Sequence, residues 1–145
     1  MVLGQHSGAG ALGAVLGDLA GEGWSRVSDV APSPTLTDWR RAAEAGAPCP
    51  VPSIENALSA LGPLADIGWW DETQGLPAGP AFILDLEDRG SAEGGLLLRS
   101  EGDDRLSGWR PEAGALTAFE QVEVALSPTM PGAARRVAIV GRLQS

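Results

Sequence analysis

The side chains that most often carry chemistry are scarce in this sequence of 145 residues, which contains one histidine, His6, and one cysteine, Cys49. A single histidine excludes a metal site built from several imidazoles of one chain, and His6 lies in a glycine-rich leader where nothing orients it for a catalytic triad. Cys49 lies between two prolines, and His6 is the only imidazole that could act as its base. We therefore expect Cys49 to be a small buried hydrophobic residue rather than a nucleophile.

Carboxylates form two runs, made of Asp85, Glu87 and Asp88 and of Glu101, Asp103 and Asp104. Two acids about 5 to 9 Å apart suit glycoside hydrolysis, but acidic turns often meet that distance by accident. Neither run matches a calcium loop, and the spaced glycines of "GQHSGAG" match neither a phosphate loop nor a dinucleotide turn. Solvated turns are the favoured interpretation, so we predict no catalytic residue, no metal and no cofactor.

The charge balance limits the classes of partner. A net charge of -9 and a pI near 4.4 argue against nucleic acid and against anionic membrane surfaces. The apolar start lacks the positive region of a secretory signal, and Asp18 interrupts it before it reaches the length of a membrane span. We expect a soluble protein without a stable membrane span, in the cytoplasm or in an assembled particle of bacterial or phage origin rather than classically secreted.

The length predicts a single domain over residues 1–145. Within it we distinguish four segments: an apolar, glycine-rich leader or helix at 1–23, a helical half rich in Pro and Gly at 24–66, a boundary at 67–80 and an antiparallel β half at 81–145.

Three short helices are expected in the first half. The first carries Leu12, Val15, Leu16 and Leu19 at helical spacing and should end at Gly21.

The second helix should begin with Thr35 and Asp38 at the spacing of a capping box. The third should begin at Ser53 as N-cap and end near Leu61, before Pro63.

After Gly79 the apolar period changes from 3.6 to 2, which is typical of strands. Phe82 and Leu84 alternate with Ile83 and Asp85, as in a strand with one buried face, and residues 101–104 should form the turn of a hairpin. The connections are too short for helical crossovers. We therefore predict an α+β fold, with short N-terminal helices packed on a C-terminal antiparallel β-meander of about four to five strands.

Trp69 and Trp70 are adjacent, so in an extended chain their side chains point to opposite sides. We favour a role in closing the core, and the alternative makes the outward indole, predicted to be Trp70, an anchor for a partner. Arginines near the C-terminus are interpreted as strand residues paired with acids, with a positive strip as the alternative. The candidate partner-binding residues are Leu12, Leu16, Trp69, Trp70, Arg135, Arg136 and Arg142.

The lack of recognisable chemistry favours a non-catalytic structural or assembly subunit that acts through protein surfaces, in a phage particle, a secretion apparatus or a filament. An exposed sheet edge would offer backbone groups to a protein partner or to a second copy of the chain. The first alternative is an acidic adaptor, inhibitor or immunity-type protein for a basic partner. The second is a small carboxylate-based enzyme or a ligand-binding domain.

Overall fold

The computed structural model describes residues 5–22, 24–70, 80–86, 96–100, 106–109, 113–120, 122–126 and 138–143. Its helices are α1 (Val15–Glu22), α2 (Ser33–Glu44) and α3 (Val51–Ala57), with the 3-10 segments η1 (Ala9–Ala14) and η2 (Ser59–Leu61). Its strands are β1 (Gln5–Ser7), β2 (Trp24–Ser28), β3 (Leu64–Trp70), β4 (Ala81–Asp85), β5 (Leu96–Ser100), β6 (Leu106–Trp109), β7 (Leu116–Phe119), β8 (Val122–Leu126) and β9 (Ala138–Leu143).

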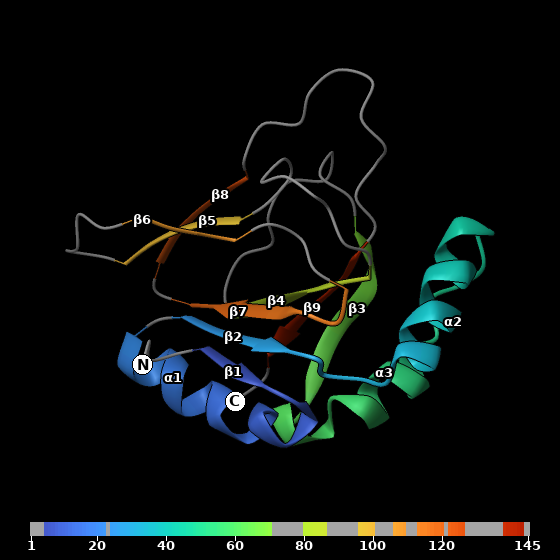
Figure 1. The fold of residues 1–145 in the computed structure, drawn as a ribbon, viewed down its shortest axis with the longest axis horizontal. Coiled ribbons are helices and arrows are strands. Elements are labelled where there is room, and N and C mark those ends of the chain that lie inside the picture. The colour runs from blue at the N-terminus through green and yellow to red at the C-terminus, as the bar shows by residue number, and fades with distance from the viewer. Residues whose placement is uncertain are drawn as a thin grey trace.

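The strands form two sheets. The larger has six strands in the order β1-β2-β7-β4-β9-β3, and the smaller has three in the order β6-β5-β8. Figure 1 shows the smaller sheet over one face of the larger sheet, and α1 and α3 on the opposite side. Helix α2 lies beyond the β3 edge, so the six-stranded sheet is enclosed from several directions.

The predicted α+β class of short helices with an antiparallel sheet is confirmed. Strands β2, β7, β4, β9 and β3 pair antiparallel, and only β1 joins its neighbour β2 in parallel. The predicted hairpin is also confirmed, because β5 pairs antiparallel with β6 across residues 101–105.

Three strands of the larger sheet come from the part of the chain that we expected to be a leader, a helical half and a boundary. The pattern of β2 gave no sign of a strand because its residues 24–27 are all buried, so apolar and polar positions do not alternate. Strand β3 has a register shift between Ala65 and Gly68, where Asp66 has a φ of 55°. This β-bulge breaks the period of 2 that would identify the strand.

Both faces of β4 are buried, which corrects the prediction of one buried face. Residues Ala81 to Asp85 are at most 1% exposed. Figure 1 gives the reason, since the helices lie on one side of the six-stranded sheet and the smaller sheet on the other.

The helix starts differ from the predicted caps. Helix α2 begins at Ser33 after Pro32 and has no side-chain cap, so the predicted capping box of Thr35 and Asp38 is wrong. Helix α3 begins at Val51, and the Ser53 hydroxyl instead accepts a hydrogen bond from the Trp39 indole at 3.3 Å. Prolines in the first turn set these starts, because a fixed φ suits that position. No helix in the described ranges is long and apolar enough to cross a membrane.

The main hydrophobic core lies between the larger sheet and the helices. It joins helix residues to every second residue of the strands, which places the following fully or largely buried side chains together: Leu12, Val15, Leu19, Val27, Val30, Leu36, Trp39, Ile54, Leu58, Leu61, Phe82, Leu84, Leu86, Leu116, Ala118, Ile139 and Leu143. We call this the helix-side core.

Candidate functional site

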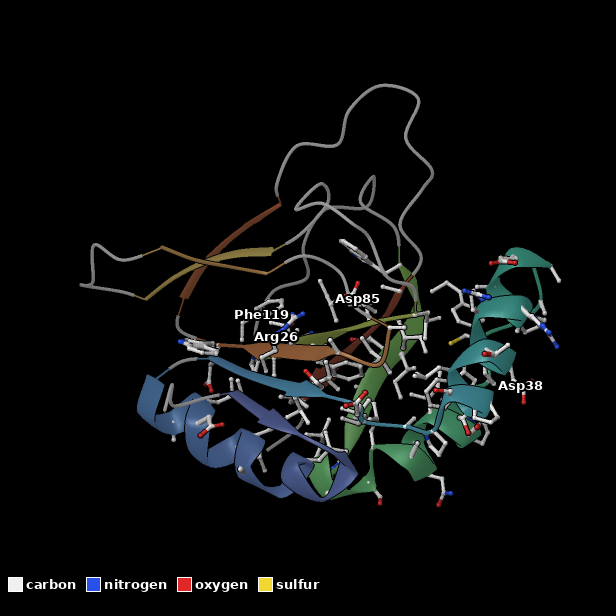
Figure 2. The ribbon with its side chains drawn as sticks, in the orientation of Figure 1. Arg26, Asp38, Asp85 and Phe119 are labelled. Carbon is white, nitrogen blue, oxygen red and sulfur yellow. The ribbon has the colours of Figure 1, made fainter. Side chains whose placement is uncertain are left out.

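The opposite face of the six-stranded sheet is turned toward the smaller sheet, and we call it the interior face. Its second, smaller hydrophobic cluster contains Trp70, Ala81, Ile83, Phe119 and Ala138, with Val140 packed against it. Figure 2 shows that Arg26, Asp85 and Phe119 lie on this side of the sheet, away from α1. A charged side chain buried on such a face needs a partner, so Arg26 and Asp85 are the first candidates for a site.

Strand register holds Arg26 on the interior face. Arg26 lies opposite Thr117, which lies opposite Ile83, so β2, β7 and β4 place the three residues in one row. The Nη1 atom of Arg26 donates a hydrogen bond of 2.8 Å to the Thr117 hydroxyl. Arg26 is only 6% exposed and Thr117 is fully buried. Because a guanidinium stays protonated in proteins, the interior face carries a fixed positive charge.

Asp85 is positioned at the end of β4 by backbone bonds to the segment that precedes β7. Its amide donates to the Ala115 carbonyl at 2.9 Å, and the Gly114 amide donates to the Asp85 carbonyl at 2.9 Å. Gly114 has a φ of 85°, a conformation that side chains disfavour, so glycine allows the turn that makes this contact. The Asp85 side chain is 1% exposed.

Arg26 and Asp85 are separated by two strand steps and two residues along the sheet. At about 4.8 Å for each strand step and about 3.3 Å for each residue, their Cα atoms lie roughly 12 Å apart. The side chains between them on the interior face are small or aliphatic, with Thr117 and Ile83 in the Arg26 row. This face therefore carries the cationic Arg26 at one end, the carboxyl group of Asp85 at the other, and mainly apolar side chains between them.

The two tryptophans lie on strand β3 and face opposite sides, as predicted. Trp69 packs against the helix-side core and donates from its indole nitrogen to the Ala47 carbonyl at 2.8 Å. Trp70 belongs to the interior cluster and is 3% exposed. The expectation that Trp70 is the outward indole is therefore corrected, because Trp70 is itself buried in the interior cluster.

Of the other proposed partner-binding residues, those that the structure describes do not form one exposed patch. Leu12 is 1% exposed in the helix-side core, whereas Leu16 is 38% exposed on α1. Arg142 pairs with Asp66 at 3.8 Å, which agrees with the interpretation of strand arginines paired with acids. Arg135 and Arg136 lie outside the described residues. A partner-binding role for this set stays a prediction.

Of the residues considered for chemistry, His6 is on edge strand β1, opposite Val27 of β2. Cys49 is half-buried beside the helix-side core, as a small hydrophobic residue would be, and burial raises the pKa of its thiol. Of the six carboxylates in the two acidic runs, Asp85 is the one within the described ranges, and the other five lie outside them. In the described parts of the chain, no three His, Cys, Asp or Glu residues are close enough together to hold a metal ion.

Sequence reasoning named Asp85 but missed Arg26 and Thr117. The signal for Arg26 was a charged residue in a short run that is otherwise apolar or small, "WSRVS". That signal is weak, because the hydroxyl that Arg26 binds belongs to a residue 91 positions away in the sequence.

Comparisons with known proteins identify the fold. No protein family model and no curated protein matches the sequence. A prolyl-4-hydroxylase from Pseudomonas putida matches the structure with a TM-score of 0.59 and 18% identity, over 90% of this chain and 96% of that one. A Trichoplax adhaerens prolyl hydroxylase, in complex with a peptide fragment of the hypoxia inducible factor oxygen degradation domain, matches at 0.66 and 10%, over 92% and 88%.

HygX from Streptomyces hygroscopicus, with nickel and 2-oxoglutarate bound, matches with a TM-score of 0.62 and 14% identity, over 87% of this chain and 83% of that one. HygX has also been solved with iron bound. At these identities the likeness shows that the chain has the fold of these hydroxylases and nothing finer.

The residues of this chain do not fit the iron centre that the fold suggests. Non-haem iron oxygenases hold their ion with two histidines and one carboxylate. The entire sequence contains one histidine. The chain therefore cannot supply that set of ligands from its own residues.

The fold overturns the leading hypothesis of a non-catalytic structural or assembly subunit. Its structural neighbours are prolyl hydroxylases and HygX, so the chain shares its fold with enzymes rather than with structural or assembly subunits. The hypothesis was based on an absence of motifs, and residues that strand register brings together leave no motif in the sequence.

Proposed function

We propose that the chain acts on a small organic acid held against the interior face, with the Arg26 guanidinium as the anchor for a carboxylate of the ligand. The observation that carries this proposal is a buried arginine on the face that the two sheets enclose. A guanidinium offers a planar fork of donors that matches a carboxylate. At 6% exposure, an ion pair with Arg26 would be screened little by water and salt.

The neighbouring structures support the class of ligand. HygX was solved with 2-oxoglutarate, a dicarboxylic acid, and the neighbours are enzymes. Thr117 would fix the orientation of the guanidinium through its 2.8 Å hydrogen bond.

Calorimetric titration in the presence of a metal chelator tests the proposal. The probes are 2-oxoglutarate and succinate, with succinamide as the uncharged control. We expect the two acids to bind and Arg26→Gln to weaken them about 10- to 100-fold, because hydrogen bonds to charged groups contribute about 1.5 to 3 kcal/mol. Arg142→Gln is the matched control, since that side chain on β9 is 52% exposed and its substitution should leave binding unchanged.

Two results would overturn the proposal: no binding of either acid to the folded protein, or equal affinities in the wild type and in a folded Arg26→Gln variant. If Arg26→Gln does not fold, Arg26→Lys keeps the charge but loses the fork, and it should still weaken the acids relative to wild type.

A peptide is the second candidate ligand, because the Trichoplax neighbour was solved with a peptide fragment. A peptide that carries a carboxylate would compete with succinate for Arg26 in the same titration. A protein partner at exposed Leu16, or self-association, stays a prediction that light scattering over a range of concentrations can test.

A further inference from the structure

The distribution of metal-binding side chains conflicts with the chemistry that the fold suggests. Donor atoms that share one ion lie within about 4 Å of each other, since each metal–ligand bond is about 2 Å long. A centre on the interior face would therefore need two or more donors at adjoining positions. Asp85 is the carboxylate that the described part of this face provides.

His6 is too far across the sheet to join Asp85 at one ion. The strand order places β2 and β7 between β1, which carries His6, and β4, which carries Asp85. Three strand steps of about 4.8 Å separate the two backbones by roughly 14 Å. The backbone row that contains His6 runs through Val27, Leu116 and Leu84, and Asp85 lies one residue further along β4.

The interior face also opposes a divalent ion electrostatically. Arg26 fixes a positive charge on that face in a buried environment, where charges interact more strongly than in water. An ion beside Asp85 would gain one carboxylate and would be repelled by the guanidinium.

We infer that this chain is a metal-independent form of the hydroxylase fold, in which the fixed cation of the interior is the Arg26 side chain and no iron centre is assembled. This inference goes beyond the proposed ligand class, because a protein could bind an organic acid with or without iron. A measurement of bound metal therefore tests metal independence separately from the proposed ligand class.

The test measures metal retention in the full chain. The protein is stripped with chelator, incubated without oxygen with Fe(II), and separately with Co(II) or Ni(II), then desalted and analysed for metal by mass spectrometry. HygX, which has been solved with iron bound, is treated in parallel as the positive control. We expect HygX to retain its metal and this chain to retain far less than one equivalent, with no change in Tm on addition or removal of metal.

Retention of about one equivalent of any of these ions by the wild type overturns the inference. Asp85→Asn and His6→Ala then locate the donors, since loss in the first places the ion on the interior face and loss in the second places it at the sheet edge. The absorption spectrum of the Co(II) sample provides a second readout that does not depend on activity, and a ligand-field band that persists after desalting would contradict metal independence. A failure of acid binding with no retained metal would instead remove the proposed function alone.

Discussion

Among the glycines that the structure describes, Gly141 leaves the least room for a larger residue. It lies on β9 opposite Phe82 of β4, and the Phe82 ring is fully buried in the helix-side core. A Cβ at Gly141 would be 2.5 Å from Cε1 and 2.6 Å from Cζ of Phe82, and 3.3 Å from Cγ1 of Ile67. Carbon atoms pack at about 3.5 to 4.0 Å, so the ring would have to move by roughly 1 Å.

Gly141→Ala should therefore destabilise the protein, although alanine usually suits a strand better than glycine. Overpacking a well-packed core costs about 1 to 3 kcal/mol, and the lower flexibility of alanine in the unfolded chain offsets about 0.5 to 1 kcal/mol of that. We expect a net loss of about 1 to 2 kcal/mol in the free energy of unfolding, and a fall in Tm of about 2 to 8 °C for a chain of this length.

Urea unfolding followed by circular dichroism measures the effect. Gly68→Ala on β3 is the control, because a Cβ there would meet no atom within 4 Å and stability should not fall. Phe82→Leu should relieve the clash, so the double variant with Gly141→Ala should be more stable than the sum of the single effects predicts, by about 1 kcal/mol. A Gly141→Ala protein as stable as the wild type, or additive effects in the double variant, would refute the packing argument.

Three further predictions concern single contacts. Thr117→Val removes the acceptor of the Arg26 hydrogen bond, and urea unfolding should show a loss of about 1.5 to 3 kcal/mol; a loss under about 0.5 kcal/mol would contradict the role given to that bond. Trp69→Phe keeps a ring but loses the bond to the Ala47 carbonyl, so we expect a loss of about 1 kcal/mol, and unchanged stability would count against it. Burial raises the pKa of the Cys49 thiol, so its alkylation rate should reach half-maximum at a higher pH than that of a cysteine peptide. An equal or lower midpoint pH would contradict the raised pKa. The same shift lowers stability as pH rises past the ordinary thiol pKa, because the unfolded chain releases that proton first.

The parts of the fold that follow a local period were predictable. Strand β4 was found from its alternation, and the β5–β6 hairpin from its flanking runs and turn. Strand β2 was not, because burial of residues 24–27 removes the alternation on which recognition depends. Strand β3 spans the end of the predicted helical half and the start of the predicted boundary, and it was missed because the bulge near Asp66 disrupts its period.

The candidate site could not be predicted, because register brings its residues together from distant parts of the chain. Arg26 meets Thr117 only through the β2–β7 pairing, and Asp85 shares their face only through the β4–β7 pairing. A shift of one residue in either pairing would turn these side chains toward the helices. No local pattern specifies such a pairing, so an arginine in "WSRVS" carries no recognisable meaning in the sequence alone.

The two faces of the six-stranded sheet explain how this fold can exist without the two histidines of a non-haem iron centre. On β4, Phe82 and Leu84 pack into the helix-side core, whereas Ile83 and Asp85 face the interior. Because these side chains alternate, residues on the interior face can change while the packing that holds the helices to the sheet is kept. The stability of the fold therefore does not require the donor set of its neighbours. A likeness at 10 to 18% identity consequently extends to the arrangement of strands, while the chemistry has to be inferred from Arg26, Thr117 and Asp85 themselves.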